Sequence, residues 1–204
     1  MSGAATARRT APWQEQSVSF GKFLFIPFFI ALLASSMMVL ETYKEPTLHH
    51  YLSWISFQAW AMYFLAGCTL KGGGKVMLGY LGGALASVAI MELAGLCEGW
   101  GLSKAAAVPI AVFIVVIPVI SAERVPGFNF VPAWFVGAGF YFALITLSDA
   151  EKLHGLNKLP KWDKYLEAGL HLMVSCAIGQ VYGIVTVFIR KRYEAMAKGS
   201  GKGK

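Results

Sequence analysis

Four polar side chains that could bind a ligand or exchange a proton lie inside apolar stretches of this 204-residue chain, namely Glu92, Glu167, His171 and Gln180. Glu167 and His171 are four residues apart, so on a helix they share one face. A charge at the centre of a membrane helix costs about 2.5–3.5 kcal/mol, so such residues usually face a partner or a watery cavity. We therefore expect a Glu92–His171–Glu167 cluster that forms a polar vestibule or a proton-linked site. A buried structural hydrogen bond, or a Glu92 that is simply protonated, is the alternative.

Further candidate ligands gather on one side of the expected membrane topology. They are His49, His50, His154 and His171, together with Asp149, Glu151 and Asp163. Histidine and carboxylate together suit zinc and other transition metals. Their spacings match no standard ligand pattern, and two adjacent histidines are common in ordinary loops. We therefore expect no metal and no cofactor.

Recognisable catalytic motifs do not occur. The segment Lys71–Lys75 is rich in glycine, but it lacks the spacing of a phosphate-binding loop and has no preceding strand. Neither a GxSxG nor an HExxH pattern occurs, and no nucleophile is spaced for pairing with a base. We expect that the protein is not an enzyme.

The elements that position these residues follow from a deficit of charge. Only 14% of the residues are charged, against about 25% in an average soluble domain, while 56% are hydrophobic. The runs 105–122 and 125–148 contain no charged residue. This composition excludes a disordered chain, and it argues against a soluble enzyme or a nucleic-acid binder. A polytopic membrane protein in contact with the lipid bilayer remains.

Six stretches are long and apolar enough for a membrane-spanning helix, which needs about 17–25 residues. They are Phe23–Leu40, Tyr51–Leu70, Val76–Cys97, Ala105–Ser121, Val131–Ser148 and Leu166–Ile189. The expected fold is an all-α bundle of six transmembrane helices, with connectors that include Lys71–Lys75. The first apolar run exceeds the roughly 7–15 residues of a signal peptide, so we expect a retained helix.

The distribution of basic residues predicts the orientation of the bundle. Twelve of the 18 Lys and Arg residues fall on the side that carries both termini, and basic residues favour the cytoplasmic side. We expect a cytoplasmic tail over residues 1–22, a membrane domain over 23–189 and a basic cytoplasmic tail over 190–204. The loop from Asp149 to Tyr165, on the outer side, is long enough for structure of its own.

Short sequence matches suggest an inverted repeat of three helices plus three, at offsets of 82, 78 and 88 residues. Chance matches between apolar helices are the alternative explanation. If the repeat exists, Glu92 and Gln180 occupy equivalent positions. Two small-xxx-small motifs, Gly79 with Gly83 and Gly179 with Gly183, predict close approach between helices.

Several motifs resemble one known family. They are Leu52-Ser53-Trp54 with Phe57, Tyr63-Phe64 with Gly72-Gly73, Phe130-Val131-Pro132 with Phe135 and Gly137-Ala138, and Gly179 with Gly183. Together they resemble domain-of-unknown-function family 1097, a group of small bacterial inner-membrane proteins. The resemblance covers about Tyr51 to Ile189 and implies an inner-membrane location. It implies no activity and no site residues.

These observations lead to two expectations about function. The first is passage of a small polar solute through the bundle, as a channel or transporter and in a homo-oligomer, with Glu92, His171 and Gln180 lining or gating the path. The second is a non-transporting membrane subunit that anchors or assembles a larger complex through its glycine-rich faces and outer loop.

Overall fold

The computed structural model describes residues 20–43, 48–147 and 155–199. Throughout these ranges the regular elements are helices. They are α1 (Phe20–Thr42), α2 (Ser53–Leu65), α3 (Leu70–Gly99), α4 (Lys104–Ser121), the short 3-10 helix η1 (Ala122–Arg124), α5 (Val131–Thr146), the 3-10 helix η2 (Leu156–Lys158) and α6 (Lys161–Gly199). The expectation of an all-helical fold is confirmed for the described residues.

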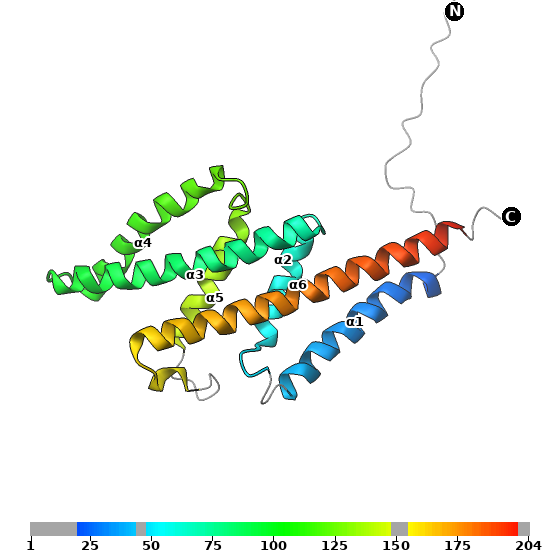
Figure 1. Ribbon diagram of the computed structural model, residues 1–204, viewed down its shortest axis with the longest axis horizontal. Coiled ribbons are helices and arrows are strands. Elements are labelled where there is room, and N and C mark those ends of the chain that lie inside the picture. The colour runs from blue at the N-terminus through cyan, green and yellow to red at the C-terminus, as the bar shows by residue number, and fades with distance from the viewer. Residues whose placement is uncertain (1–19, 44–47, 148–154, 200–204) are drawn as a thin grey trace, which may run out of the picture.

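Two long helices, α3 and α6, run antiparallel and side by side through the molecule (Figure 1). The shorter helices α2 and α5 cross them at a steep angle, with α5 packed mainly on α3 and α2 packed mainly on α6. On the outside, α4 lies along α3, and α1 lies beside α6. The first turns of α1 contact the last turns of α6, where the rings of Phe25 and Tyr193 stack with their centroids 4.3 Å apart.

The second helix is shorter than the predicted segment Tyr51–Leu70, because a left-handed turn stops it at Leu65. Gly67 has φ +92° and Cys68 has φ +56°. The backbone N–H of Gly67 donates to Phe64 O, and that of Cys68 donates to Tyr63 O. This pair of bonds is the Schellman motif, in which a glycine in the left-handed conformation ends a helix.

The segment Lys71–Lys75, expected as a connector, instead forms the first turns of α3. Thr69 is the N-cap, and its Oγ1 accepts a hydrogen bond from the Gly72 backbone N–H at 3.0 Å. Gly73 is buried, and a Cβ there would lie 3.1 Å from Gln180 Oε1 and 3.2 Å from the Tyr63 ring. Gly72 and Gly73 therefore serve close packing at this position, whereas a Cβ on Gly74 would meet nothing within 4 Å.

The last two helices depart from the prediction at their ends. Helix α5 begins at Val131 as expected and ends at Thr146. Helix α6 begins at Lys161 rather than Leu166, and it continues through the first ten residues of the expected basic tail to Gly199. Residues 148–154, at the end of the predicted fifth segment and in the loop expected on the outer side, lie outside the described residues, as do 1–19 and 200–204.

The two crossing pairs of helices make contact in the same way. A Cβ built on Gly79 of α3 would lie 2.5 Å from the Cβ of Ala133 in α5, and Trp134 is the next residue. A Cβ built on Gly179 of α6 would lie 2.7 Å from the Cβ of Ala59 in α2, and Trp60 is the next residue. In each pair an Ala-Trp step of the short helix therefore sits directly on a glycine of the long helix.

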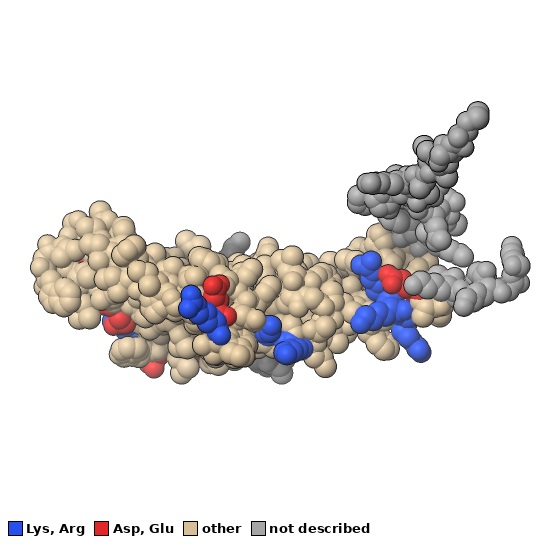
Figure 2. Space-filling view, turned by 90° about the horizontal axis from the view of Figure 1, so that it is seen from above, with Lys and Arg blue, Asp and Glu red and all other residues tan. Residues whose placement is uncertain are grey.

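Four of the helices, α1, α3, α4 and α6, are long and apolar enough to cross a membrane. At 1.5 Å per residue, α2 with 13 residues and α5 with 16 are about 20 and 24 Å long, below the roughly 30 Å of a hydrocarbon core. Much of the surface lacks charge, and basic side chains gather near the end where α6 finishes (Figure 2).

Candidate functional site

The polar residues of the buried interior concentrate on α6. Among the described residues seven polar side chains are buried, namely Ser53, Ser56, Ser87, His171, Ser175, Gln180 and Thr186. Four of the seven lie on α6, and Ser56 of α2 donates to the Ser175 carbonyl on α6 at 2.6 Å. The contact between α2 and α6 is thus the most polar part of the core.

Near the start of α6, Glu167 and His171 lie one turn apart as expected. Glu167 Oε1 is 4.0 Å from His171 Nε2 and 2.9 Å from His50 Nε2, and His50 precedes α2. His171 is almost fully buried, with 1% exposure. Its Nδ1 lies 2.9 Å from the His50 carbonyl oxygen, which can only accept, so Nδ1 carries the hydrogen.

Ser175 continues this polar line one turn further into the bundle. Its Oγ accepts a hydrogen bond from the Leu52 backbone N–H at 2.9 Å and donates to the His50 carbonyl at 3.4 Å. The backbone that enters α2 is therefore held on α6 by side chains rather than by apolar packing alone. Buried backbone groups need such partners, because an unpaired one is costly.

Gln180 lies deeper, where α2, α3 and α6 meet. Its Nε2 donates to the Ala59 carbonyl at 2.7 Å, and its Oε1 faces Gly73 at the start of α3. The glycines on either side of it bring α2 close to α6, because a Cβ at Gly179 would strike the Ser56 carbonyl and one at Gly183 would lie 2.6 Å from the Tyr63 ring.

Glu92 lies elsewhere, so the expected three-residue cluster is found only in its Glu167–His171 part. The Glu92 carboxylate accepts from Lys161 Nζ at 2.6 Å and from the Tyr165 hydroxyl at 2.9 Å. The side chains of Lys161 and Glu92 are 56% and 32% exposed. This pair ties the C-terminal half of α3 to the first turn of α6 at the surface.

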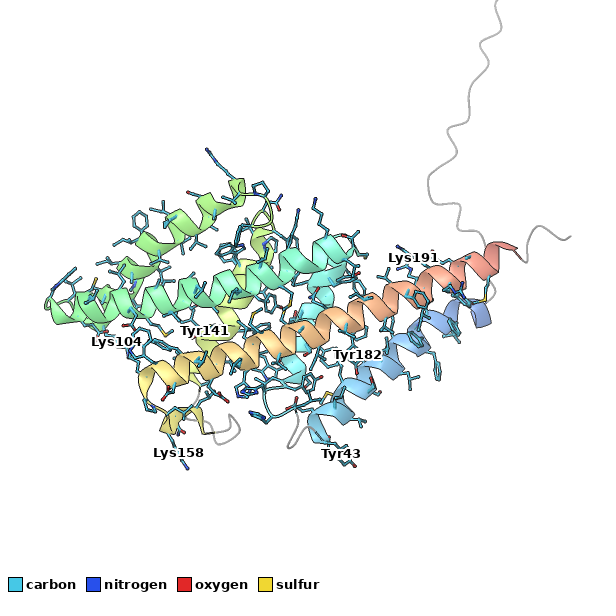
Figure 3. The ribbon with its side chains drawn as sticks, in the orientation of Figure 1. Tyr43, Lys104, Tyr141, Lys158, Tyr182 and Lys191 are labelled. Atoms are coloured by element: carbon cyan, nitrogen blue, oxygen red, sulfur yellow. The ribbon has the colours of Figure 1, made fainter. Side chains whose placement is uncertain are left out.

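Two tyrosines fix α6 against its other neighbours (Figure 3). The Tyr182 hydroxyl is 2.8 Å from Ser36 Oγ, which joins α6 to α1. The Tyr141 hydroxyl of α5 donates to the Tyr165 carbonyl at 2.8 Å, near the start of α6. Polar contacts therefore hold α6 along most of its length.

Sequence reasoning missed that His49 and His50 approach Glu167. The only signal was that all the histidines fall on one expected side of the membrane, because no spacing relates residues 49 and 50 to residue 167. In the structure, potential ligand atoms of His49, His50 and Glu167 all lie within 4.8 Å of one another. Such a set could hold a cation or exchange a proton.

Most of the larger hollows among the described residues are apolar. One groove between α3 and α4 is lined by Leu81, Leu85, Ile114, Pro118 and Trp134, among others. Large apolar side chains such as Phe28 and Phe113 are about 70% exposed on α1 and α4. Surfaces of this kind are compatible with lipid contact.

The four long apolar helices, α6 included, are compatible with a multi-pass membrane protein. The chain matches the family described as "Protein of unknown function (DUF1097)" over residues 28–190, and it belongs to this family. The family resemblance seen in the sequence is thus confirmed, and it extends into α1. No curated protein and no solved structure matches the chain.

Proposed function

We propose that this protein carries a small polar solute across a bacterial inner membrane along the buried face of α6, with proton exchange at Glu167 and His171. The observation that carries the proposal is the line of polar side chains running from Glu167 through His171 and Ser175 to Gln180. Polar residues inside a membrane are expensive, and they typically mark solute paths and proton relays.

Helix packing alone does not require these polar groups. The contact between α3 and α5 uses the same Ala-Trp step on a glycine, yet among the described residues Ser87 is its only buried Ser, Thr, Gln or His side chain, beside the hydroxyls of Tyr80 and Tyr141. The α2–α6 contact has the same geometry and holds Ser56, Ser175 and Gln180. A functional role is the simplest reason to retain the additional polar groups.

The proposal also includes a topology of six membrane crossings with both termini on the same side of the membrane. Helices α1 and α3 run in one direction, and α4 and α6 run in the other (Figure 1). The chain must therefore return between the members of each pair, and α2 and α5 provide these returns. Arg190, Lys191 and Arg192 follow the apolar part of α6, which favours cytoplasmic termini.

The paired glycine contacts also support an inverted repeat of three helices plus three. Gly79 corresponds to Gly179, and Ala133–Trp134 corresponds to Ala59–Trp60, by what each contacts. This register differs from the short sequence matches, and it aligns Gln180 with Tyr80 rather than with Glu92. Inverted repeats place substrate sites at the interface between the two halves, where Gln180 lies.

Flux through liposomes tests the proposal. Purified full-length protein would be reconstituted and assayed with a panel of small polar solutes, while a pH-sensitive dye inside the liposomes follows protons. We expect solute and proton uptake above empty liposomes. Gln180→Leu and Glu167→Gln should each reduce solute flux. The first removes a polar group from the path, and the second removes the titratable carboxylate that the proposed proton exchange needs.

Ser87→Ala is the matched control, since it removes a buried polar group from the α3–α5 contact. Its flux should equal that of the unaltered protein. The proposal fails if no solute in the panel crosses, or if Ser87→Ala and Gln180→Leu behave alike. Absence of flux together with stoichiometric co-purification of another membrane protein would favour the non-transporting subunit instead.

Cysteine labelling of cells tests the orientation independently, in a variant that lacks the native Cys68, Cys97 and Cys176. A membrane-impermeant reagent should label a cysteine at position 154 and fail to label one at position 198. The opposite pattern would reverse the orientation.

A further inference from the structure

The geometry points to a transition-metal site, suited to Zn²⁺, formed by His49, His50 and Glu167 at the outer end of α6. One potential ligand atom of each residue lies within 4.8 Å of the other two. Two imidazoles and one carboxylate are a ligand set found in zinc sites with an open fourth position. This proposal concerns binding alone, so it does not depend on transport.

The distances between the three potential ligand atoms need only a small adjustment to fit around a zinc ion. Ligands 2.0–2.2 Å from a tetrahedral zinc ion lie about 3.3–3.6 Å from one another. His50 Nε2 is already 2.9 Å from Glu167 Oε1. His49 is exposed, so its ring can rotate toward the other two without disturbing the core.

The surrounding contacts hold the backbone of one ligand residue, His50, in place. The His50 carbonyl accepts from His171 Nδ1 at 2.9 Å and from Ser175 Oγ at 3.4 Å. These bonds fix the backbone of His50 on α6, one turn from Glu167. Residues around a metal site that help to orient its ligands contribute to its affinity, and here they act on the backbone of His50 rather than on its ring.

The rings and charges also suit a cation. His49 and His50 are neighbours in sequence, yet their ring centroids are only 3.8 Å apart, so both side chains gather on one side of the turn. Neutral imidazoles and an ionised Glu167 would give the site one negative charge, which a divalent ion overcompensates. Partial exposure of Glu167 leaves a path from solution.

Titration of Zn²⁺ into the chelator-treated full-length protein in detergent, followed by calorimetry, tests the site. We expect saturable binding of one ion per chain. His49→Ala and Glu167→Gln should each weaken binding at least about tenfold. The first of these changes an exposed side chain, so it leaves the fold intact.

Asp163→Asn, which changes an exposed carboxylate one turn before Glu167, is the matched control, and it should not alter Zn²⁺ affinity. Co²⁺ in place of Zn²⁺ should show the intense visible absorption of a tetrahedral site, and Glu167→Gln should abolish it. The proposal is overturned if no saturable binding occurs, or if the control weakens binding as much as the ligand variants. Flux is not measured in this experiment, so its failure would leave the transport proposal standing.

Discussion

The α2–α6 and α3–α5 contacts solve the same packing problem with different chemistry. In both, an Ala-Trp step of a short helix rests on a glycine of a long helix. The α3–α5 contact is almost entirely apolar, whereas the α2–α6 contact contains hydrogen-bonded serines, Gln180 and His171. Close approach therefore depends on small residues, and most of the buried polar side chains are an addition at the α2–α6 contact.

The largest effect should come from filling the apolar contact. Gly83→Ala places a Cβ against the Trp134 carbonyl and 2.5 Å from the Ala138 backbone nitrogen, so the two helices must move apart. We expect the free energy of unfolding to fall by about 3 kcal/mol, at the upper end of typical overpacking. Unfolding in mixed detergent micelles, followed by circular dichroism, measures it.

Gly95→Ala is the control for this variant, because a Cβ on Gly95, also on α3, meets nothing within 4 Å. Alanine there should leave stability unchanged or raise it by up to about 1 kcal/mol, since alanine favours helix more than glycine does. Equal losses from Gly83→Ala and Gly95→Ala would show that close approach is not what stabilises α3 against α5.

A smaller loss should follow when the polar contact loses a hydrogen bond. Ser175→Ala leaves the buried Leu52 N–H without its acceptor, so we expect a loss of about 2 kcal/mol, within the usual range for an unsatisfied buried group. Ser87→Ala should lose less than about 1 kcal/mol, because both carbonyls that Ser87 donates to can keep other partners. The same micelle unfolding assay compares them, and equal losses would mean that the serines of the two contacts play the same part.

Much of the fold could be predicted from the sequence. The apolar run of α4 and the first residue of α5 agree with the structure, because long uncharged runs bounded by Gly and Pro leave few alternatives. Gly79, Gly83, Gly179 and Gly183 all lie against a neighbouring helix, as their spacing indicates. The sequence could not say which helix each glycine faces, since that choice depends on the tertiary fold.

The site was harder to predict than the fold. The spacing of Glu167 and His171 places them on one helical face, and the structure has them there. The placement of Glu92 followed from expected depth in the membrane, which does not specify direction around the helix axis. His50 reaches Glu167 through hydrogen bonds of its backbone to α6, and no local sequence signal encodes such a contact.

The smallest effect should come from the pair outside both contacts, Glu92 with Lys161. Its exposed groups form a surface ion pair, so Lys161→Met should lower the free energy of unfolding by less than about 1 kcal/mol, and added salt should reduce the difference further. Glu92→Gln should leave solute flux unchanged while Gln180→Leu reduces it. A flux loss in Glu92→Gln equal to that in Gln180→Leu would move the path away from the α2–α6 contact and toward the surface of α3. The polar groups of the α2–α6 contact would then have no special role in transport. The difference between the two contacts would concern only how the helices pack.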